Sequence, residues 1–87
     1  MFVKILEKGR SDREIVHECR KYSAVTSDEK PFEMMFFIYH DEEEGRDVEQ
    51  ISVCKKTSEV FIENKEGKTV GSFRWKIDEG RNKAIRI

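Results

Sequence analysis

Apolar and polar residues alternate with a period of two along much of this chain, a pattern that is typical of β-strands. The plainest case is residues 59–75, "EVFIENKEGKTVGSFRW", where two β-rich runs flank the polar segment "NKEGK". Asn64 suits the first position of a type I turn, and Gly67 suits the left-handed position that follows. We therefore predict a β-hairpin with strands at about 58–64 and 68–77.

Three other segments have strand patterns: residues 2–6, 32–40 and 48–56. The acidic run "DEEEGRD" separates the last two and contains Gly45, so it is predicted to be a loop that joins an antiparallel pair. The C-terminal "RNKAIRI" fits either a further strand, by the alternation of Ile85 and Ile87, or a frayed end.

Residues 11–25, "SDREIVHECRKYSAV", fit two structures. In a helix, Ser11 and Glu14 form a capping box, and Ile15, Cys19 and Tyr22 lie at helical spacing. In strands, "GRSD" forms a tight turn, and the β-branched and aromatic residues that follow favour extended backbone. We favour strands and predict a mainly β fold, a small antiparallel barrel or curled sheet of about six strands. The alternative is an α+β fold with one helix at about 11–22 packed on an antiparallel sheet.

The segment "FEMMFFIYH" at residues 32–40 is apolar on both faces. As a strand it directs Phe36 and Ile38 to one side and Met35, Phe37 and Tyr39 to the other. One face fills the core, and the other is covered either by a helix at 11–22 or by another chain. Because we favour strands at 11–25, we expect Met35, Phe37 and Tyr39 to form a protein interface, in a symmetric homodimer by default.

Composition agrees with one folded domain, residues 1–87. The chain has 37% hydrophobic and 40% charged residues, and at 87 residues it has room for a single core. The apolar run in "MFVKILEKGR" is too short for the centre of a signal peptide, and no segment approaches the length of a membrane span. We therefore expect a cytoplasmic protein in which Cys19 and Cys54 are free thiols.

Charge is balanced overall, with 17 basic and 18 acidic residues, but it is unevenly distributed. Residues 41–50, "DEEEGRDVEQ", contain six acids and one base. Such a run attracts a basic protein surface. The predicted partner-binding residues therefore include four consecutive acids: Asp41, Glu42, Glu43 and Glu44.

Residues 74–87 have the opposite charge, with five bases and two acids, and contain Trp75. Bases beside an aromatic ring can bind phosphates and stack on nucleobases. The alternative function is therefore nucleotide or nucleic-acid binding, by Tyr22, Arg74, Trp75, Lys76, Arg81 and Lys83. Trp75 shares a strand face with Phe73 and Ile77, however, and for this residue we favour a place in the core.

The chemistry of catalysis or metal binding has little support. His17, Cys19, His40 and Cys54 supply four soft ligands, but not as the close pairs that are usual for zinc. Neither cysteine is part of a nucleophile motif, and no Gly-rich loop offers an oxyanion site. We expect no catalytic residue, no metal site and no cofactor.

These observations favour a small non-catalytic binding protein that acts through protein–protein contacts. Compact, charged single domains of this kind are often encoded by bacteriophages and mobile elements as inhibitors of host proteins. The alternative is a protein that sequesters a nucleotide or nucleic acid with its basic C-terminal strand.

Overall fold

Strands are the only regular elements in the part of the chain that the structure describes. The structure is a computed structural model, and it describes residues 1–9, 11–41 and 47–87. Over these residues the chain forms nine strands: β1 (Phe2–Glu7), β2 (Arg13–Glu18), β3 (Lys21–Ser27), β4 (Lys30–Tyr39), β5 (Val48–Cys54), β6 (Ser58–Glu63), β7 (Thr69–Phe73), β8 (Trp75–Asp78) and β9 (Lys83–Arg86). The mainly β prediction is confirmed. The described residues contain no helix long and apolar enough to cross a membrane.

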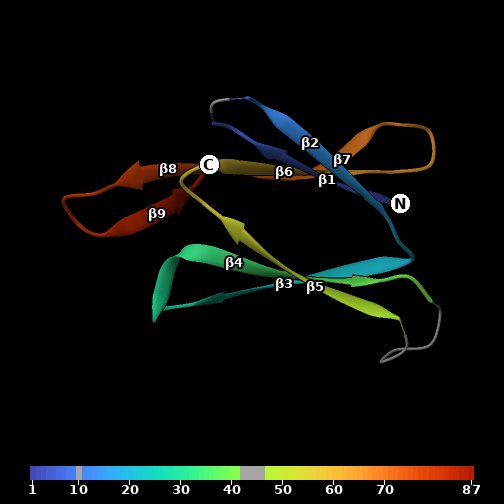
Figure 1. Cartoon of the computed structure of the whole chain (residues 1–87), viewed down its shortest axis with the longest axis horizontal. Helices are drawn as coiled ribbons and strands as arrows, with labels where there is room; N and C mark the ends of the chain where they lie inside the picture. The colour runs from blue at the N-terminus through green and yellow to red at the C-terminus, as the bar shows by residue number, and fades with distance from the viewer. Residues whose placement is uncertain (10, 42–46) are drawn as a thin grey trace.

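The strands form two antiparallel sheets and a separate hairpin. The first sheet has the order β2-β1-β6-β7, the second has the order β3-β4-β5, and β8 pairs only with β9. Figure 1 shows the two sheets as two layers, with the β8–β9 hairpin projecting from one end. The predicted small antiparallel barrel or curled sheet of about six strands is therefore correct only as a mainly β, antiparallel fold: over the described residues the two sheets do not pair with each other to close a barrel, and there are more than six strands.

Two short breaks and a C-terminal strand account for the three strands beyond the predicted six. The first break is at Cys19 and Arg20, where the chain passes from one layer to the other. The Cys19 N–H donates to the carbonyl of Met1, and the Arg20 N–H donates to the carbonyl of Tyr39. The second is at Arg74, which divides the predicted strand 68–77 into β7 and β8. The C-terminal segment forms β9, so the strand interpretation of "RNKAIRI" is confirmed.

The alternative of a helix at 11–22 is also wrong. β2 pairs with β1 along its whole length, from Arg13 opposite Glu7 to Glu18 opposite Phe2. In this register Ile15 faces the other sheet, whereas Val16 is 49% exposed on the outside. The pairing with β1 thus supplies hydrogen-bond partners for the backbone of β2, a segment whose sequence alone fits either a helix or a strand.

The core lies between the two sheets. Its buried side chains come from alternate strand positions and are Val3, Ile5, Cys19, Phe36, Ile38, Val53, Val60, Ile62 and Phe73. At its centre the rings of Phe36 and Phe73 meet edge to face, with centroids 5.2 Å apart. Tyr22 packs against both rings. This aromatic cluster connects β7, at the edge of the first sheet, with β4, in the middle of the second sheet.

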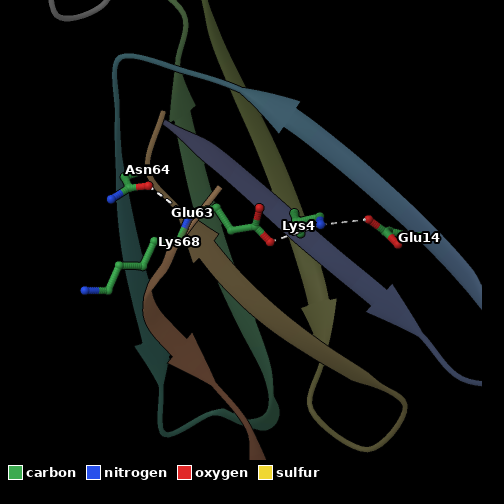
Figure 2. A network of polar contacts seen from close by, with 5 residues as sticks. All are labelled: Lys4, Glu14, Glu63, Asn64 and Lys68. Carbon is green, nitrogen blue, oxygen red and sulfur yellow. Dashed lines mark hydrogen bonds and ion pairs between the residues drawn. The ribbon is translucent and has the colours of Figure 1, made fainter. Parts of the chain in front are cut away.

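The turn between β6 and β7 has the predicted chemistry. The Gly67 N–H donates to the carbonyl of Asn64, and Gly67 has a φ of +80°, which favours glycine. The Asn64 Oδ1 accepts the backbone N–H groups of Glu66 and Lys68, at 3.1 and 2.9 Å. Figure 2 shows the contact with Lys68. The hairpin prediction is confirmed.

Lys4 connects three strands on the outer face of the first sheet. Its Nζ lies 3.3 Å from Glu14 Oε1 on β2 and 3.0 Å from Glu63 Oε2 on β6, as Figure 2 shows. The hydrogen bonds to Glu63 and then Glu14 raise the pKa of Lys4 above its ordinary value. These contacts are diagonal cross-strand pairs, which favour this register over a slip of the strands.

Glu59 on β6 forms a similar pair of contacts, and we predict a pH-dependent effect of its removal. Arg74 Nε lies 2.7 Å from Glu59 Oε2, and Lys8 Nζ lies 3.0 Å from Oε1; these hydrogen bonds hold the pKa of Glu59 below its ordinary value. We expect Glu59→Gln to lower the free energy of unfolding by about 0.5 kcal/mol near neutral pH, a small effect because Lys8 and Arg74 are well exposed.

The sign of the pH dependence follows from the direction of the pKa shift. A carboxyl group whose folded-state pKa is lowered stabilises the fold above its unfolded pKa, and this stabilisation is lost as pH falls through the folded value. Urea unfolding should therefore separate wild type from Glu59→Gln near neutral pH and not in acid. A difference that persists unchanged in acid would contradict the ionic explanation.

Candidate functional site

An apolar patch lies on the outer face of the β3–β4–β5 sheet. It consists of Val25 on β3, Met35, Phe37 and Tyr39 on β4, and Val48 on β5, and we call it the β4 patch. Met35 lies opposite Val25, and Tyr39 lies opposite Val48. The side chains are therefore neighbours in one surface and not isolated apolar residues. The three predicted interface residues of β4 are together in it.

No other described strand covers the β4 patch. Val25 is 52% exposed and Val48 is 37% exposed, although both belong to residue types that are usually buried. In Figure 1 the other layer and the β8–β9 hairpin lie on the opposite side of this sheet. The Nζ of Lys21 lies 4.9 Å from the centroid of the Tyr39 ring, at one end of the patch.

The outer face of the first sheet differs in its distribution of charge. There the apolar side chains of Phe2, Leu6 and Phe61 alternate with the ion pairs centred on Lys4 and Glu59. Beside the β4 patch the cross-strand neighbours of Phe37 are the uncharged Ser23 and Gln50. Of the two outer sheet faces, the β4 patch therefore has fewer charged side chains among its apolar ones. A low density of charge is typical of the centre of a protein interface.

The acidic part of the predicted partner-binding site begins just after β4. Asp41 is exposed and follows the Tyr39 end of the β4 patch by two residues. Glu42, Glu43 and Glu44 lie outside the described residues.

The basic residues predicted from the C-terminal segment do not all gather in one place. Tyr22 is in the aromatic cluster, 6.4 Å from Phe36 and 6.2 Å from Phe73 between ring centroids. Arg74 pairs with Glu59. Lys76 lies opposite Ile85 in the hairpin, on the face away from Trp75. The structure thus separates Tyr22, Arg74 and Lys76 from the remaining three.

Trp75, Arg81 and Lys83 do come together. They line a groove of about 600 Å³ between the β8–β9 hairpin and the turn that joins β3 to β4, which we call the hairpin groove. Trp75 is half-buried: it packs against the core and also lines the groove. The groove has two further bases that were not among the predicted binding residues, Lys55 and Arg86.

Lys55 is the least exposed charged group of the hairpin groove, at 8%. Its Nζ donates to Thr26 Oγ1 at 3.1 Å and lies 5.9 Å from the centroid of the Trp75 ring. Within residues 1–9, 11–41 and 47–87, no ion pair of Lys55 with a carboxylate is formed. Of these two bases, Arg86 could have been found from the sequence, because two-residue spacing places it with Ala84 on one face of β9, opposite Trp75. Lys55 had no such signal.

The histidines and cysteines have other surroundings. His17 Nδ1 and His40 Nε2 lie 3.4 and 3.1 Å from the two carboxylate oxygens of Glu49, at the open side between β2 and β5. Among the described residues, no group of three or more His, Cys, Asp or Glu side chains is arranged to hold a metal ion.

Both thiols are free. Burial raises the pKa of Cys19. For Cys54, desolvation raises the pKa, but hydrogen bonds from the Thr57 side chain and from the backbone at Lys56 and Thr57 outweigh it, so the pKa falls below its ordinary value. Cys54 lies opposite Glu33 on the outer side of β5, whereas His17 contacts Glu49 between the sheets. This arrangement does not pair the thiol with that histidine as a base.

Comparison with known proteins gives no relative on which to base a function: no protein-family model, no curated protein and no solved structure matches this chain.

Proposed function

We propose that this is a non-catalytic binding protein that acts in the cytoplasm through protein–protein contacts, and that it forms a homodimer through the β4 patch. The observation that carries the proposal is the outward row of Met35, Phe37 and Tyr39, half-buried within their own sheet and flanked by the exposed Val25 and Val48, on a sheet whose other face already fills the core. An apolar sheet face of this kind is stabilised when it packs on a second sheet.

The charges at the two ends of the patch favour a second copy as the occupant. Glu33 lies near the start of β4, and Lys21 lies opposite Tyr39 at its end. A twofold axis that lies in the interface and crosses β4 at right angles places the Glu33 end of each copy over the Lys21 end of the other. Glu33 also lies 3.7 Å from Lys30 (Oε2 to Nζ), a loose pair of exposed side chains, so a contact with Lys21 of a second copy adds to this pair. The patch is therefore suited to an isologous interface chiefly by its apolar surface.

The magnitude of the apolar contribution suggests a modest affinity. Completing the burial of the five side chains contributes about 5 kcal/mol, and association costs at least about 4 kcal/mol. The surplus from apolar burial is only about 1 kcal/mol, so backbone and charge contacts at the rim have to supply most of the roughly 8 kcal/mol that a micromolar dissociation constant requires. We expect a dissociation constant on the order of micromolar.

The dimer presents two copies of the acidic segment that begins at Asp41. We propose that this segment contacts a basic surface on a target protein, with Asp41, Glu42, Glu43 and Glu44 as the contact residues. Two acidic segments on one particle increase the rate of encounter and the avidity for such a target. This is the mode of action expected of a phage or mobile-element inhibitor of a host protein.

Sedimentation velocity over the micromolar range tests the proposal. We expect a monomer–dimer equilibrium, and we expect Phe37→Asp to raise the dimer dissociation constant by at least about 30-fold, because it places a charge at the centre of the interface. Val70→Asp is the matched control, since Val70 is 58% exposed on β7 and lies outside the β4 patch.

Either of two results would reject the proposed interface. One is a wild-type chain that stays monomeric throughout the micromolar range. The other is a dimer that Phe37→Asp and Val70→Asp weaken to the same extent.

A further inference from the structure

The hairpin groove contains a charge that no described residue of the protein neutralises. Lys55 is 8% exposed, and its Nζ contacts a hydroxyl group and an aromatic ring. Removing an ammonium group from water is costly unless an anion or several hydrogen bonds replace the water. Among the described residues no carboxylate of this chain is placed to do so. The surroundings of Lys55 therefore favour binding of an external anion.

Three further bases line the same groove, and they are held in different ways. Arg86 donates from Nη2 to the carbonyl of Ser72 at 2.8 Å, and its guanidinium lies 4.1 Å from the centroid of the Phe73 ring. Arg81 Nε lies 3.7 Å from Asp78 Oδ2, a loose contact between exposed side chains. Lys83 is exposed at the start of β9. One end of the groove is therefore strongly positive.

The acids near the groove do not cancel this charge. The lining has four bases, Lys55, Arg81, Lys83 and Arg86, and one acid, Asp28. Asp28 lies in the turn between β3 and β4, across the groove from the hairpin. An anion that enters the groove meets an excess of positive charge from the hairpin and from Lys55.

The rest of the lining is uncharged. Its apolar part comes from Trp75, Met34, Pro31 and Ala84, and its polar part from Thr26, Ser27 and Asn82. Small-molecule sites of this type combine an apolar wall with a few charged groups, and a volume of about 600 Å³ lies within their usual range. The groove is thus suited to a ligand that has an anionic end and a planar body.

We propose that the hairpin groove binds a nucleoside phosphate. Lys55 and the bases of the hairpin contact the phosphate, and the nucleobase lies against Trp75 and Met34. A groove of this size accommodates one nucleotide and not an extended strand. This site is on a different surface from the β4 patch, so it goes beyond the proposed protein contacts and stands or falls independently of them.

Trp75 is the only tryptophan in the chain, so its intrinsic fluorescence reports directly on the groove. The four ribonucleoside monophosphates, inorganic phosphate and the nucleoside adenosine are titrated against the whole chain. We expect at least one nucleotide to change the Trp75 emission in a saturable way, and to bind at least about tenfold more tightly than phosphate or adenosine alone. Added salt should weaken the binding, because the contacts to phosphate are ionic.

Three variants locate the ligand. We expect Lys55→Met and Arg81→Gln each to weaken nucleotide binding, Lys55→Met by about tenfold or more because it removes the most desolvated contact. Arg81 is exposed and its replacement leaves the fold intact, so it remains informative if Lys55→Met does not fold. Lys76→Gln is the matched control: it removes the same charge from the same hairpin, on the face away from the groove, and binding should be unchanged.

Several results overturn the proposal. These are an emission that no nucleotide changes at millimolar concentration, a response that Lys55→Met and Arg81→Gln leave unaltered, and a loss of affinity that is equal in Lys76→Gln. Binding of a single-stranded oligonucleotide without binding of any mononucleotide also overturns it, in favour of a nucleic-acid surface.

Discussion

We expect Phe36→Ala to lower the free energy of unfolding by about 3 to 5 kcal/mol, which is a large part of the total stability of a domain of this size. Phe36 is 0% exposed, and its ring contacts Phe73 edge to face. It lies on β4, in the middle strand of the second sheet, and faces the first sheet. Its removal leaves a cavity between the two layers that no neighbouring side chain is free to fill.

Phe37→Ala is the matched control, because the same side chain is removed from the next residue of the same strand. Phe37 faces outward in the β4 patch, so in the monomer we expect a loss of less than about 1 kcal/mol. Urea unfolding, at a protein concentration low enough to keep the chain monomeric, measures both variants. Similar losses for Phe36→Ala and Phe37→Ala would show that the two faces of β4 have been assigned wrongly.

The second large effect is expected at Tyr22, and we predict that Tyr22→Ala costs about 2 to 4 kcal/mol. The Tyr22 ring packs against Phe36 and Phe73, and it is the residue of β3 that joins the aromatic cluster. Tyr22→Phe keeps these ring contacts, so we expect it to retain most of the stability. Thermal and urea unfolding of the three proteins check this order.

Tyr22 lies near the start of β3, opposite Ile38, whereas the groove is lined by the turn at the other end of β3. Tyr22 does not line the groove, so Tyr22→Phe should leave nucleotide binding unchanged. Tyr39→Ala, at the same end of the second sheet but on its outer face, should affect association and not unfolding of the monomer. A Tyr22→Ala protein as stable as wild type would contradict the aromatic cluster as the centre of the core.

The parts of the fold that were predicted correctly depend on local chemistry. The β6–β7 hairpin follows from Asn64 and Gly67, because a side-chain amide that accepts two backbone N–H groups and a residue with positive φ determine the turn on their own. The two faces of β4 follow from simple alternation. In both cases the relevant contacts lie within a few residues of one another.

The parts that were missed depend on contacts between distant segments. The break at Cys19 and Arg20 exists because one N–H binds Met1 and the next binds Tyr39, and no local pattern indicates either contact. The same holds for Lys55, which reaches the hairpin groove only because the end of β5 lies beside the hairpin that contains Trp75. Tyr22 looked like a candidate for stacking on a base until its position beside Phe36 was known.

The order of the strands has a consequence for how the two layers can form. β1 and β6 are neighbours, and their Glu7–Ser58 pair joins residues 51 positions apart (58 − 7), with the whole β3–β4–β5 sheet between them in the chain. The β3–β4–β5 sheet needs only short connections, whereas the β1–β6 pair must close a long loop, and loop closure sets a larger entropic barrier to early contacts. The layer that bears the β4 patch can therefore assemble first, with both of its apolar faces open to water. Until β1 and β6 pair, both faces of this sheet expose apolar side chains to water and can associate with other chains. The inner face is buried only when the first sheet forms over it.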